Sequence, residues 1–180
     1  PQSHPPDLAP KPRPMTDSAP INLTDLPQAP PATKAGPRRR FASLRAIAAR
    51  HALGLNMDII GVVSSQAPAY QLSFARREAV EAPVSTLLAD GLACRAPDPQ
   101  SLAAVIECVD EVIAVSDEEV AAAMRLMYRA THNVAEGAGA AALAGALQLR
   151  SRGRLAGRTL GLPLTGSNVD SELFSKILAG

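Results

Sequence analysis

EVIAVSDEEV, at residues 111–120, decides the fold class because it joins a buried strand directly to a helix. EVIAV is a short apolar run rich in β-branched residues, which is typical of a strand covered on both faces. Ser116 is followed three residues later by Glu119, the spacing of a capping box, so we expect a helix to begin here. A strand that passes at once into a helix indicates an α/β arrangement.

The same alternation of strands and helices continues on both sides of this stretch. Two more apolar runs predict strands, MDIIGVV at 57–63 and RTLGLPL at 158–164, and Pro163 places the second near a sheet edge. Helices are predicted in the following segments: 41–54, 67–77, 101–109, 117–129, 132–150 and 171–178. The sequence therefore predicts an α/β fold, with a partial parallel sheet and flanking helices.

Individual residues indicate how these helices end and pack. Gly54 is expected to close the first helix, and Ser101 to cap the helix that begins there. Val120, Met124 and Met127 share one face of the helix after the capping box, which predicts a buried stripe.

The composition limits the classes of function. The chain has 180 residues, 47% of them hydrophobic, which is enough for about one domain with a core of small aliphatic side chains. A net charge of +1 gives no basis for binding nucleic acid or an acidic membrane. No apolar run approaches the roughly 20 residues of a membrane span, and no apolar segment opens the chain. Cys94 and Cys108 have no metal-ligand spacing, so thiols in a reducing cytoplasm are expected.

The first 40 residues differ from the rest. Eleven of the 16 prolines lie in residues 1–40, which show no sustained hydrophobic period. Such a segment cannot bury enough apolar surface to offset its ordering entropy, so we expect a disordered Pro-rich segment at 1–40 and a folded domain at 41–180. The proline spacing also fits a ligand of a polyproline-binding domain.

The stretch LPLTGSNVD, residues 162–170, is a candidate site. Ligands of open parallel sheets bind outside the carboxyl ends of the strands, where Thr165 is expected. Gly166 permits a sharp turn or close approach to a ligand, and Ser167 or Asn168 can cap the helix that follows. The turn is thus either a structural cap or part of a binding site.

Glu136 is a second candidate, at the expected start of a helix rich in Ala and Gly. Its carboxylate either complements the helix dipole or points into a pocket. Gly139 and Gly145 allow this helix to pack closely against its neighbours. His132 has no second ligand at metal-binding spacing, so no metal site is expected.

The order of these segments resembles the C-terminal part of the serine/threonine dehydratase family of pyridoxal-phosphate enzymes, which have fold type II. The resemblance runs from about Ala46 to the end of the chain. It is carried by these segments in succession: GVV (61–63), QAPAYQLS (66–73), LADGLA (88–93), DEVIAVSDEEVAAAMRLM (110–127), EGAGAAAL (136–143) and TGSNVD (165–170). It implies an incomplete fold type II domain and a lyase that converts L-threonine or L-serine to a 2-oxo acid and ammonia.

The resemblance also implies a pyridoxal-phosphate site. Thr165 matches the small hydroxyl or thiol residue that bonds the pyridine nitrogen, and Glu136 matches an acid beside the ring. Asp90 and Gly91 match a loop near the site. The residues expected to contact the cofactor are Thr165, Gly166, Asn168 and Glu136.

This chain departs from the family in two ways near the site. It has Thr-Gly-Ser-Asn where the family usually has Ser-Gly-Gly-Asn, and Ser167 costs on the order of 1 kcal/mol or more if that position needs a positive φ. Some relatives carry acidic metal ligands after the strand that matches residues 58–63. VVSSQAPAY, at 62–70, has no carboxylate there, so no divalent metal is expected.

The largest departure concerns lysine. The family's Schiff-base lysine and its glycine-rich phosphate loop belong to the N-terminal half, and this chain has only Lys11, Lys34 and Lys176, none in a comparable setting. We therefore expect no catalytic residue and no activity of the chain alone. The alternative is a non-catalytic remnant or a subunit-binding α/β module.

The start of the chain suggests an origin for this departure. MTDSAPINLTDL, from Met15, looks like an enzyme's start. Our hypothesis is a truncated or frame-shifted gene product that has lost most of the first half. Half of such a fold exposes sheet edges and an apolar face, so we expect either poor solubility or a homo-oligomer formed through that face.

Overall fold

The computed structural model describes residues 42–180, with side chains from residue 45 onward. The Pro-rich segment predicted at 1–40 lies outside the described residues. Those described belong to one compact unit, Ala35–Gly180.

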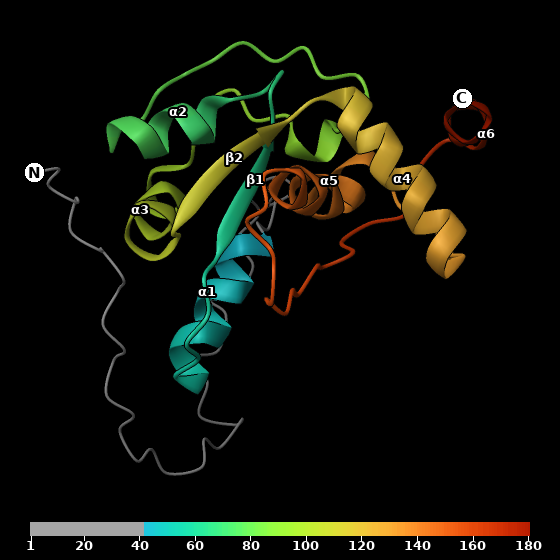
Figure 1. Cartoon of the computed structure of the whole chain (residues 1–180). Helices are drawn as coiled ribbons and strands as arrows, with labels where there is room; N and C mark the ends of the chain where they lie inside the picture. The colour runs from blue at the N-terminus through green and yellow to red at the C-terminus, as the bar shows by residue number, and fades with distance from the viewer. Residues whose placement is uncertain (1–41) are drawn as a thin grey trace, which may run out of the picture. The chain divides into compact units, whose positions relative to one another are not determined.

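Helices surround a small parallel sheet in this unit (Figure 1). In chain order the elements are α1 (Ala42–Leu53), β1 (Ile60–Ser64), α2 (Ala69–Arg76), the 3-10 helix η2 (Asp90–Leu92), α3 (Pro99–Cys108), β2 (Glu111–Val115), α4 (Asp117–Thr131), α5 (Gly137–Ser151) and α6 (Ser171–Ala179). The two strands pair in parallel, with Ile60 opposite Glu111 and Ser64 opposite Val115. This confirms the predicted α/β class with a partial parallel sheet and flanking helices.

Each face of the sheet is covered by its own hydrophobic cluster. On one face α4 and α5 pack against Val62 and Val115, and on the other α1, α2 and α3 pack against Val63 and Val112. The predicted stripe on α4 is confirmed, because Val120 and Met124 are fully buried and Met127 packs against them. Side chains of adjacent residues in a strand point to opposite faces of the sheet. Each short strand can therefore pack against helices on both faces.

The approach of α5 to the sheet depends on Gly145. A Cβ placed there would lie 2.8 Å from Val62 Cγ2 and 3.1 Å from Ile113 Cδ1. The predicted role of Gly145 in close packing is confirmed, because a Cβ there would force Val62 or α5 to shift.

The predicted start of α4 is confirmed, whereas the predicted start of α3 is wrong. Ser116 and Glu119 form the predicted capping box, with the Ser116 amide 2.7 Å from Glu119 Oε2 and the Glu119 amide 3.2 Å from Ser116 Oγ. The cap predicted at Ser101 is wrong, because α3 starts two residues earlier and Asp98 caps it. Asp98 Oδ1 accepts from the Ser101 amide at 2.8 Å, and Pro99 suits a first helical position because it has no amide hydrogen to bond.

The third strand predicted at 158–164 is wrong. The segment forms no strand, and the sheet among the described residues has two strands. Pro163 has no N–H to give to a ladder. Leu160, Leu162 and Leu164 alternate as in a strand but are 40–46% exposed, so no neighbouring layer covers them. Alternation without a covering layer does not hold a strand in place.

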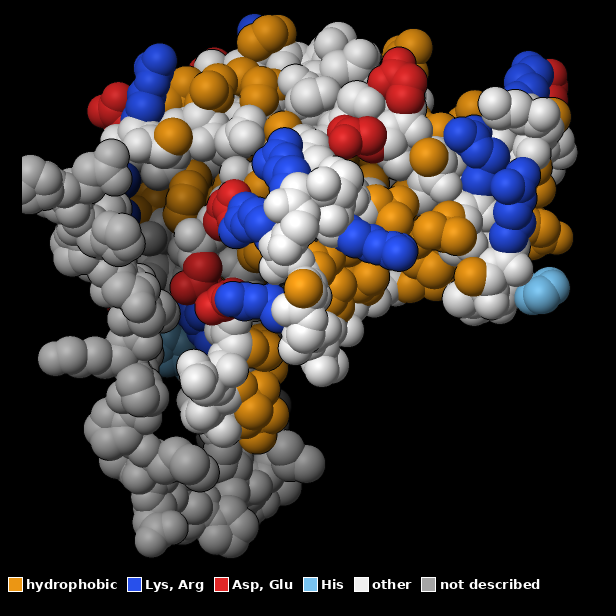
Figure 2. All heavy atoms as spheres, in the orientation of Figure 1, with side chains coloured by type: hydrophobic (Ala, Val, Ile, Leu, Met, Phe, Trp, Pro, Cys, Tyr) orange, Lys and Arg blue, Asp and Glu red, His pale blue; other side chains and the backbone are white. Residues whose placement is uncertain are grey.

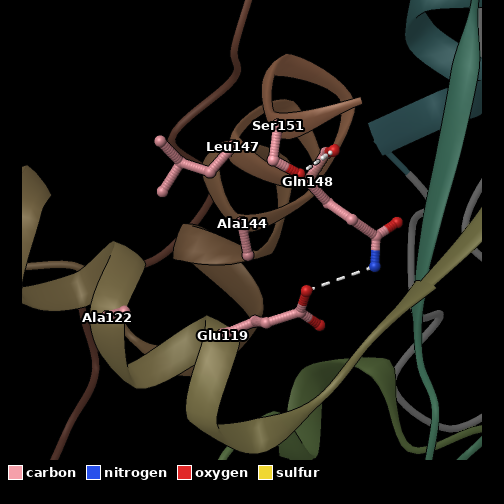
Figure 3. A pocket seen from close by; sticks show the side chains of 6 residues that line it. All are labelled: Glu119, Ala122, Ala144, Leu147, Gln148 and Ser151. Atoms are coloured by element: carbon pink, nitrogen blue, oxygen red, sulfur yellow. Dashed lines mark hydrogen bonds between the residues drawn. The ribbon is translucent and has the colours of Figure 1, made fainter. Parts of the chain in front are cut away.

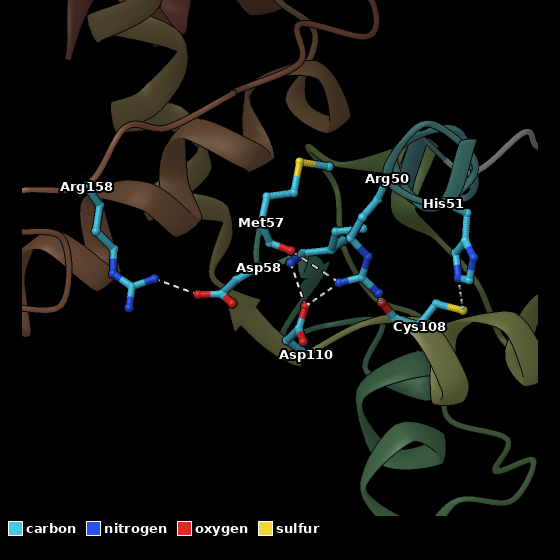
Figure 4. A network of polar contacts seen from close by, with 8 residues as sticks. Arg50, His51, Met57, Asp58, Cys108, Asp110 and Arg158 are labelled. Atoms are coloured by element: carbon cyan, nitrogen blue, oxygen red, sulfur yellow. Dashed lines mark hydrogen bonds and ion pairs between the residues drawn. The ribbon is translucent and has the colours of Figure 1, made fainter. Parts of the chain in front are cut away.

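Polar contacts join the C-terminal end of α1 to the residues that precede the two strands (Figure 4). Arg50 donates to Asp110 Oδ2 at 2.9 Å, to the Met57 carbonyl at 3.3 Å and to the Cys108 carbonyl. The same Asp110 oxygen accepts from the Ile59 amide at 2.7 Å. Arg50 therefore joins the end of α1 to the residues just before β1 and just after α3.

None of the helices in residues 42–180 is long and apolar enough to cross a bilayer. Cys94 and Cys108 are half-buried and form no disulfide.

Candidate functional site

Glu136 binds the turn at residues 165–168 through both its backbone and its side chain. Its amide donates to the Gly166 carbonyl at 3.0 Å, and its Oε2 accepts from the Asn168 amide at 3.1 Å. Glu136 is the residue before the first turn of α5, and its carboxylate caps the turn instead of its own helix. The structure thus brings together residues that lie about 30 positions apart in sequence.

Two glycines allow this close approach. A Cβ on Gly166 would lie well under 3.0 Å from the Glu136 carboxylate, and a Cβ on Gly139 would lie well under 3.0 Å from the Gly166 carbonyl oxygen. The predicted close packing at Gly139 is confirmed, with the turn as the neighbour. Without these two glycines, the start of α5 and the turn could not contact each other in this way.

The loop that contains Asp90 and Gly91 lies against the same helix start. A Cβ on Gly91 would lie 2.6 Å from Ala138 Cβ and 3.7 Å from Glu136 Oε1. A Cβ on Gly137 would meet the Leu88 carbonyl well under 3.0 Å. The loop, the start of α5 and the turn at 165–168 therefore form one cluster of closely packed backbone.

The side chains of the turn are exposed, and neither predicted cap forms. Asp170 caps α6 instead, with its Oδ1 accepting from the amides of Glu172 at 2.9 Å and Leu173 at 3.1 Å. Ser167 and Asn168 are not used because α6 begins at Ser171, so the capping position directly before it belongs to Asp170. Within residues 42–180, the Thr165 hydroxyl forms no hydrogen bond.

Ser167 carries no backbone strain. The described non-glycine residues with positive φ are Arg77 and His132, each at the C-terminal end of a helix. Ser167 is not one of them, so the cost that a positive φ would have imposed does not arise.

The described residues can be compared with what the two ends of pyridoxal phosphate need. The Thr165 hydroxyl is exposed and has no hydrogen-bond partner among the described residues, so a ring nitrogen could use it as a partner. Lys176 is the one lysine in residues 42–180; its Nζ lies 2.9 Å from Glu172 Oε1 and its side chain is 72% exposed. The other two, Lys11 and Lys34, lie outside the described residues. Residues 42–180 therefore provide no group for the aldehyde end of the cofactor.

No trio of His, Cys, Asp or Glu side chains in the described part of the chain is placed to hold a metal ion. His132 ends α4 in the left-handed conformation, with its amide 2.8 Å from the Tyr128 carbonyl.

Two surface hollows share no lining residue with this cluster, and no pattern in the sequence indicated them. One hollow of about 220 Å³ lies between α4 and α5 and is lined by Glu119, Ala122, Ala144, Leu147, Gln148 and Ser151 (Figure 3). Its polar groups are used internally, because Gln148 Nε2 donates to Glu119 Oε1 at 3.2 Å and to the Ala114 carbonyl at 3.1 Å. A second, of about 370 Å³, is lined by Arg150, Gly153, Leu155, Ala156 and Leu160.

Comparison with known families identifies the class. The model of the pyridoxal-phosphate dependent enzyme family matches residues 42–166, which include most of the backbone cluster described above. The chain belongs to this family.

Individual relatives narrow the comparison. The chain is 36% identical over 123 residues to an L-threonine ammonia-lyase of Geobacter sulfurreducens, and 31% identical over 122 residues to one of Thermotoga maritima. Each match covers 68% of this chain and 30% of the relative. The chain thus spans about a third of the length of these curated relatives.

Solved structures likewise match most of this chain but less than half of their own length. The crystal structure of a threonine deaminase of T.th. is 30% identical with a TM-score of 0.62, over 69% of this chain and 44% of that one. The processed form of threonine deaminase isoform 2 from Solanum lycopersicum is 26% identical with a TM-score of 0.69, over 74% and 40%.

Proposed function

We propose that this chain supplies the pyridine-nitrogen side of a pyridoxal-phosphate site in a lyase that deaminates L-threonine or L-serine to a 2-oxo acid and ammonia. The observation that carries the proposal is the turn at 165–168, which Glu136 fixes while the Thr165 hydroxyl stays exposed and has no hydrogen-bond partner among the described residues. The proposed contacts to the cofactor are Thr165, Gly166, Asn168 and Glu136. The names of the relatives support the choice of substrate.

The chemistry of the turn suits elimination. Pyridoxal phosphate, when bound, supplies an electron sink for the substrate carbon. A threonine hydroxyl is neutral, so it can hydrogen-bond a ring nitrogen without stabilising a proton there as a carboxylate would. Glu136 would hold the turn in place through its bonds to Gly166 and Asn168.

The chain on its own is proposed to be inactive, because a nucleophilic lysine is needed and residues 42–180 offer none at the site. The lysine would come from the part of the family fold that the matched region does not include. Borohydride reduction of the chain with pyridoxal phosphate, followed by mass spectrometry, tests this. We expect no stoichiometric label on a single lysine; a single stoichiometric label would contradict inactivity.

Ring binding is tested separately with pyridoxine phosphate, which has no aldehyde and needs no lysine. The dissociation constant is measured for the wild type, Thr165→Ser and Thr165→Val. Serine keeps the hydroxyl, so we expect it to bind as the wild type does. Valine removes it and is expected to bind about tenfold more weakly, which corresponds to about 1.4 kcal/mol. Equal affinities of all three, or no binding, would reject the role of Thr165.

A second function is favoured by the exposed leucines at 160, 162 and 164 together with the absence of a lysine from the described site. It is a non-catalytic α/β module that binds a subunit through this apolar surface, with a second copy of the chain as partner. Light scattering separates it from the first proposal, because only the module requires association.

The setting of both functions is proposed to be the cytoplasm, with a small amino acid as substrate and neither nucleic acid nor membrane as partner. The net charge of +1 and two cysteines without a disulfide support this.

A further inference from the structure

Asp117, the first residue of α4, binds three consecutive residues of the loop before η2. Its Oδ1 accepts from Thr86 Oγ1 at 2.7 Å. Its Oδ2 accepts from the Leu87 amide at 3.0 Å and the Leu88 amide at 3.3 Å. One half-buried carboxylate thus satisfies three donors in a segment that has no regular secondary structure.

Further bonds close this contact on both sides. Thr86 Oγ1 accepts from the Ala89 amide at 3.0 Å, and the Ser85 amide donates to the Gln66 carbonyl at 2.9 Å. The Gln66 side-chain amide, in the orientation that satisfies its oxygen and nitrogen, donates to Asp117 Oδ2 at 2.9 Å. The loop is therefore held at the carboxyl ends of both strands, since Gln66 follows β1 and Asp117 follows β2.

The far side of the same loop faces the candidate site. The Leu88 carbonyl lies where a Cβ on Gly137 would be, and Gly91 packs on Ala138. Both contacts are at the first residues of α5, directly after Glu136. Any movement of the loop would therefore move the start of the helix whose preceding residue holds the turn at 165–168.

We propose that Asp117 is a positioning residue for this site, acting through residues 86–91 on Glu136 and the turn. This inference rests on the proposed function for its meaning, but its geometry is tested without a cofactor. Aspartate is suited to the role because a carboxylate accepts at both oxygens. Asparagine offers one acceptor and directs its NH2 group at donors.

The test is hydrogen exchange of single backbone amides in the whole chain. In Asp117→Asn we expect at least tenfold faster exchange at Leu87 and Leu88, and faster exchange at Glu136 and Asn168, whose amides join α5 to the turn. Exchange within β2 should stay within twofold of the wild type. The control is Glu118→Gln, which removes the same charge from the same helical turn at an exposed residue.

Two results would overturn the inference: unchanged exchange at Leu87 and Leu88, or acceleration that stops at the loop and leaves Glu136 and Asn168 unaffected. If Asp117→Asn does not fold, Thr86→Val and Thr86→Ser decide, because only valine removes the hydroxyl that binds Asp117. Valine should accelerate Ala89 and Glu136, and serine should not.

Pyridoxine phosphate then separates this inference from the proposed function. If the wild type binds it, Asp117→Asn should bind about tenfold more weakly, and equal binding would overturn the positioning role. If the wild type does not bind it, the proposed function fails, and the exchange of Glu136 and Asn168 alone decides whether Asp117 positions the cluster.

Discussion

Glu136 and Gly166 are joined by a backbone hydrogen bond of 3.0 Å, and the Glu136 carboxylate occupies the space that any Cβ on Gly166 would need. The carboxylate also accepts from the Asn168 amide at 3.1 Å. This pair is the physical link between the start of α5 and the turn that carries Thr165. Its geometry makes several substitutions informative.

Gly139→Ala should destabilise the chain by up to about 2 kcal/mol. The new Cβ would collide with the backbone of Gly166, which cannot move aside easily, at a cost of about 1–3 kcal/mol. Better helix propensity returns only about 1 kcal/mol. Urea unfolding followed by circular dichroism measures the difference. Gly161→Ala is the control, because no atom lies within 4 Å of its Cβ position; equal stability of the two variants would contradict the contact.

Gly166→Ala should have a different outcome, because its Cβ meets the end of a flexible side chain. We expect a loss of about 1 kcal/mol or less, since the Glu136 carboxylate can rotate away. The bond to the Asn168 amide would then break, so exchange at that amide should rise. A protected Asn168 amide in this variant would show that the carboxylate is not the group that fixes the turn.

Asp98 should make the free energy of unfolding depend on pH in the acidic range. The Ser101 backbone amide donates to its carboxylate and lowers the pKa of Asp98 below its usual range. A lowered pKa adds stability above the ordinary value of about 3.9, and that stability is lost as the pH falls through the lower folded pKa. Asp98→Asn keeps a neutral acceptor, so it should lose less stability than the wild type below about pH 4. Parallel acid denaturation curves would contradict this.

Tyr70 should make the free energy of unfolding depend on pH in the alkaline range. Burial, followed by repulsion from negative charge on the nearby Cys94, raises the pKa of Tyr70 to about 12. A raised pKa means that the folded state holds the proton longer, so stability is lost as the pH rises from the ordinary value of about 10. Tyr70→Phe removes the ionisable hydroxyl. The stability of this variant should therefore decline less between about pH 10 and pH 12 than that of the wild type. Denaturant unfolding measures it, with Tyr128→Phe as control; an equal decline in wild type and Tyr70→Phe would reject it.

Local sequence patterns predicted the elements whose causes are local. The strand and capping box at 111–120 depend on neighbouring residues, and both are confirmed. The cap predicted for α3 was wrong because Asp98 and Ser101 are both good cap residues, and Pro99 after Asp98 favours the first helical position. The strand at 158–164 failed because a strand also needs a partner, which alternation of leucines does not reveal.

Sequence patterns did not predict the contacts between residues that are far apart in the chain. The bonds from Glu136 to the turn at 165–168 and from Asp117 to Thr86 each join segments about 30 residues apart. Local patterns singled out the turn at 165–168 and Glu136 as candidates, and the family resemblance proposed that they lie near one cofactor. Nothing in their spacing indicated that the carboxylate of Glu136 would bind the backbone of the turn, or that Asp117 would take part.

The leucines at 160, 162 and 164 are the basis of the last prediction, which concerns association. All three are 40–46% exposed, and Figure 2 shows hydrophobic side chains reaching the surface between basic ones. Apolar area on an uncovered surface favours contact with a second copy, because burial returns about 25 cal/mol per Å². The wild type should therefore gain mass with concentration in static light scattering.

Changing all three leucines to glutamine should shift the chain toward the monomer. The stability of the monomer should change by less than about 0.5 kcal/mol for each residue, because exposed side chains contribute little to folding. Leu55→Gln is a matched control, since Leu55 is 43% exposed and lies outside the segment. If the triple variant associates as strongly as the wild type, the interface lies elsewhere. If the wild type stays monomeric at every concentration, the subunit-binding module is rejected and the ring-site proposal stands alone.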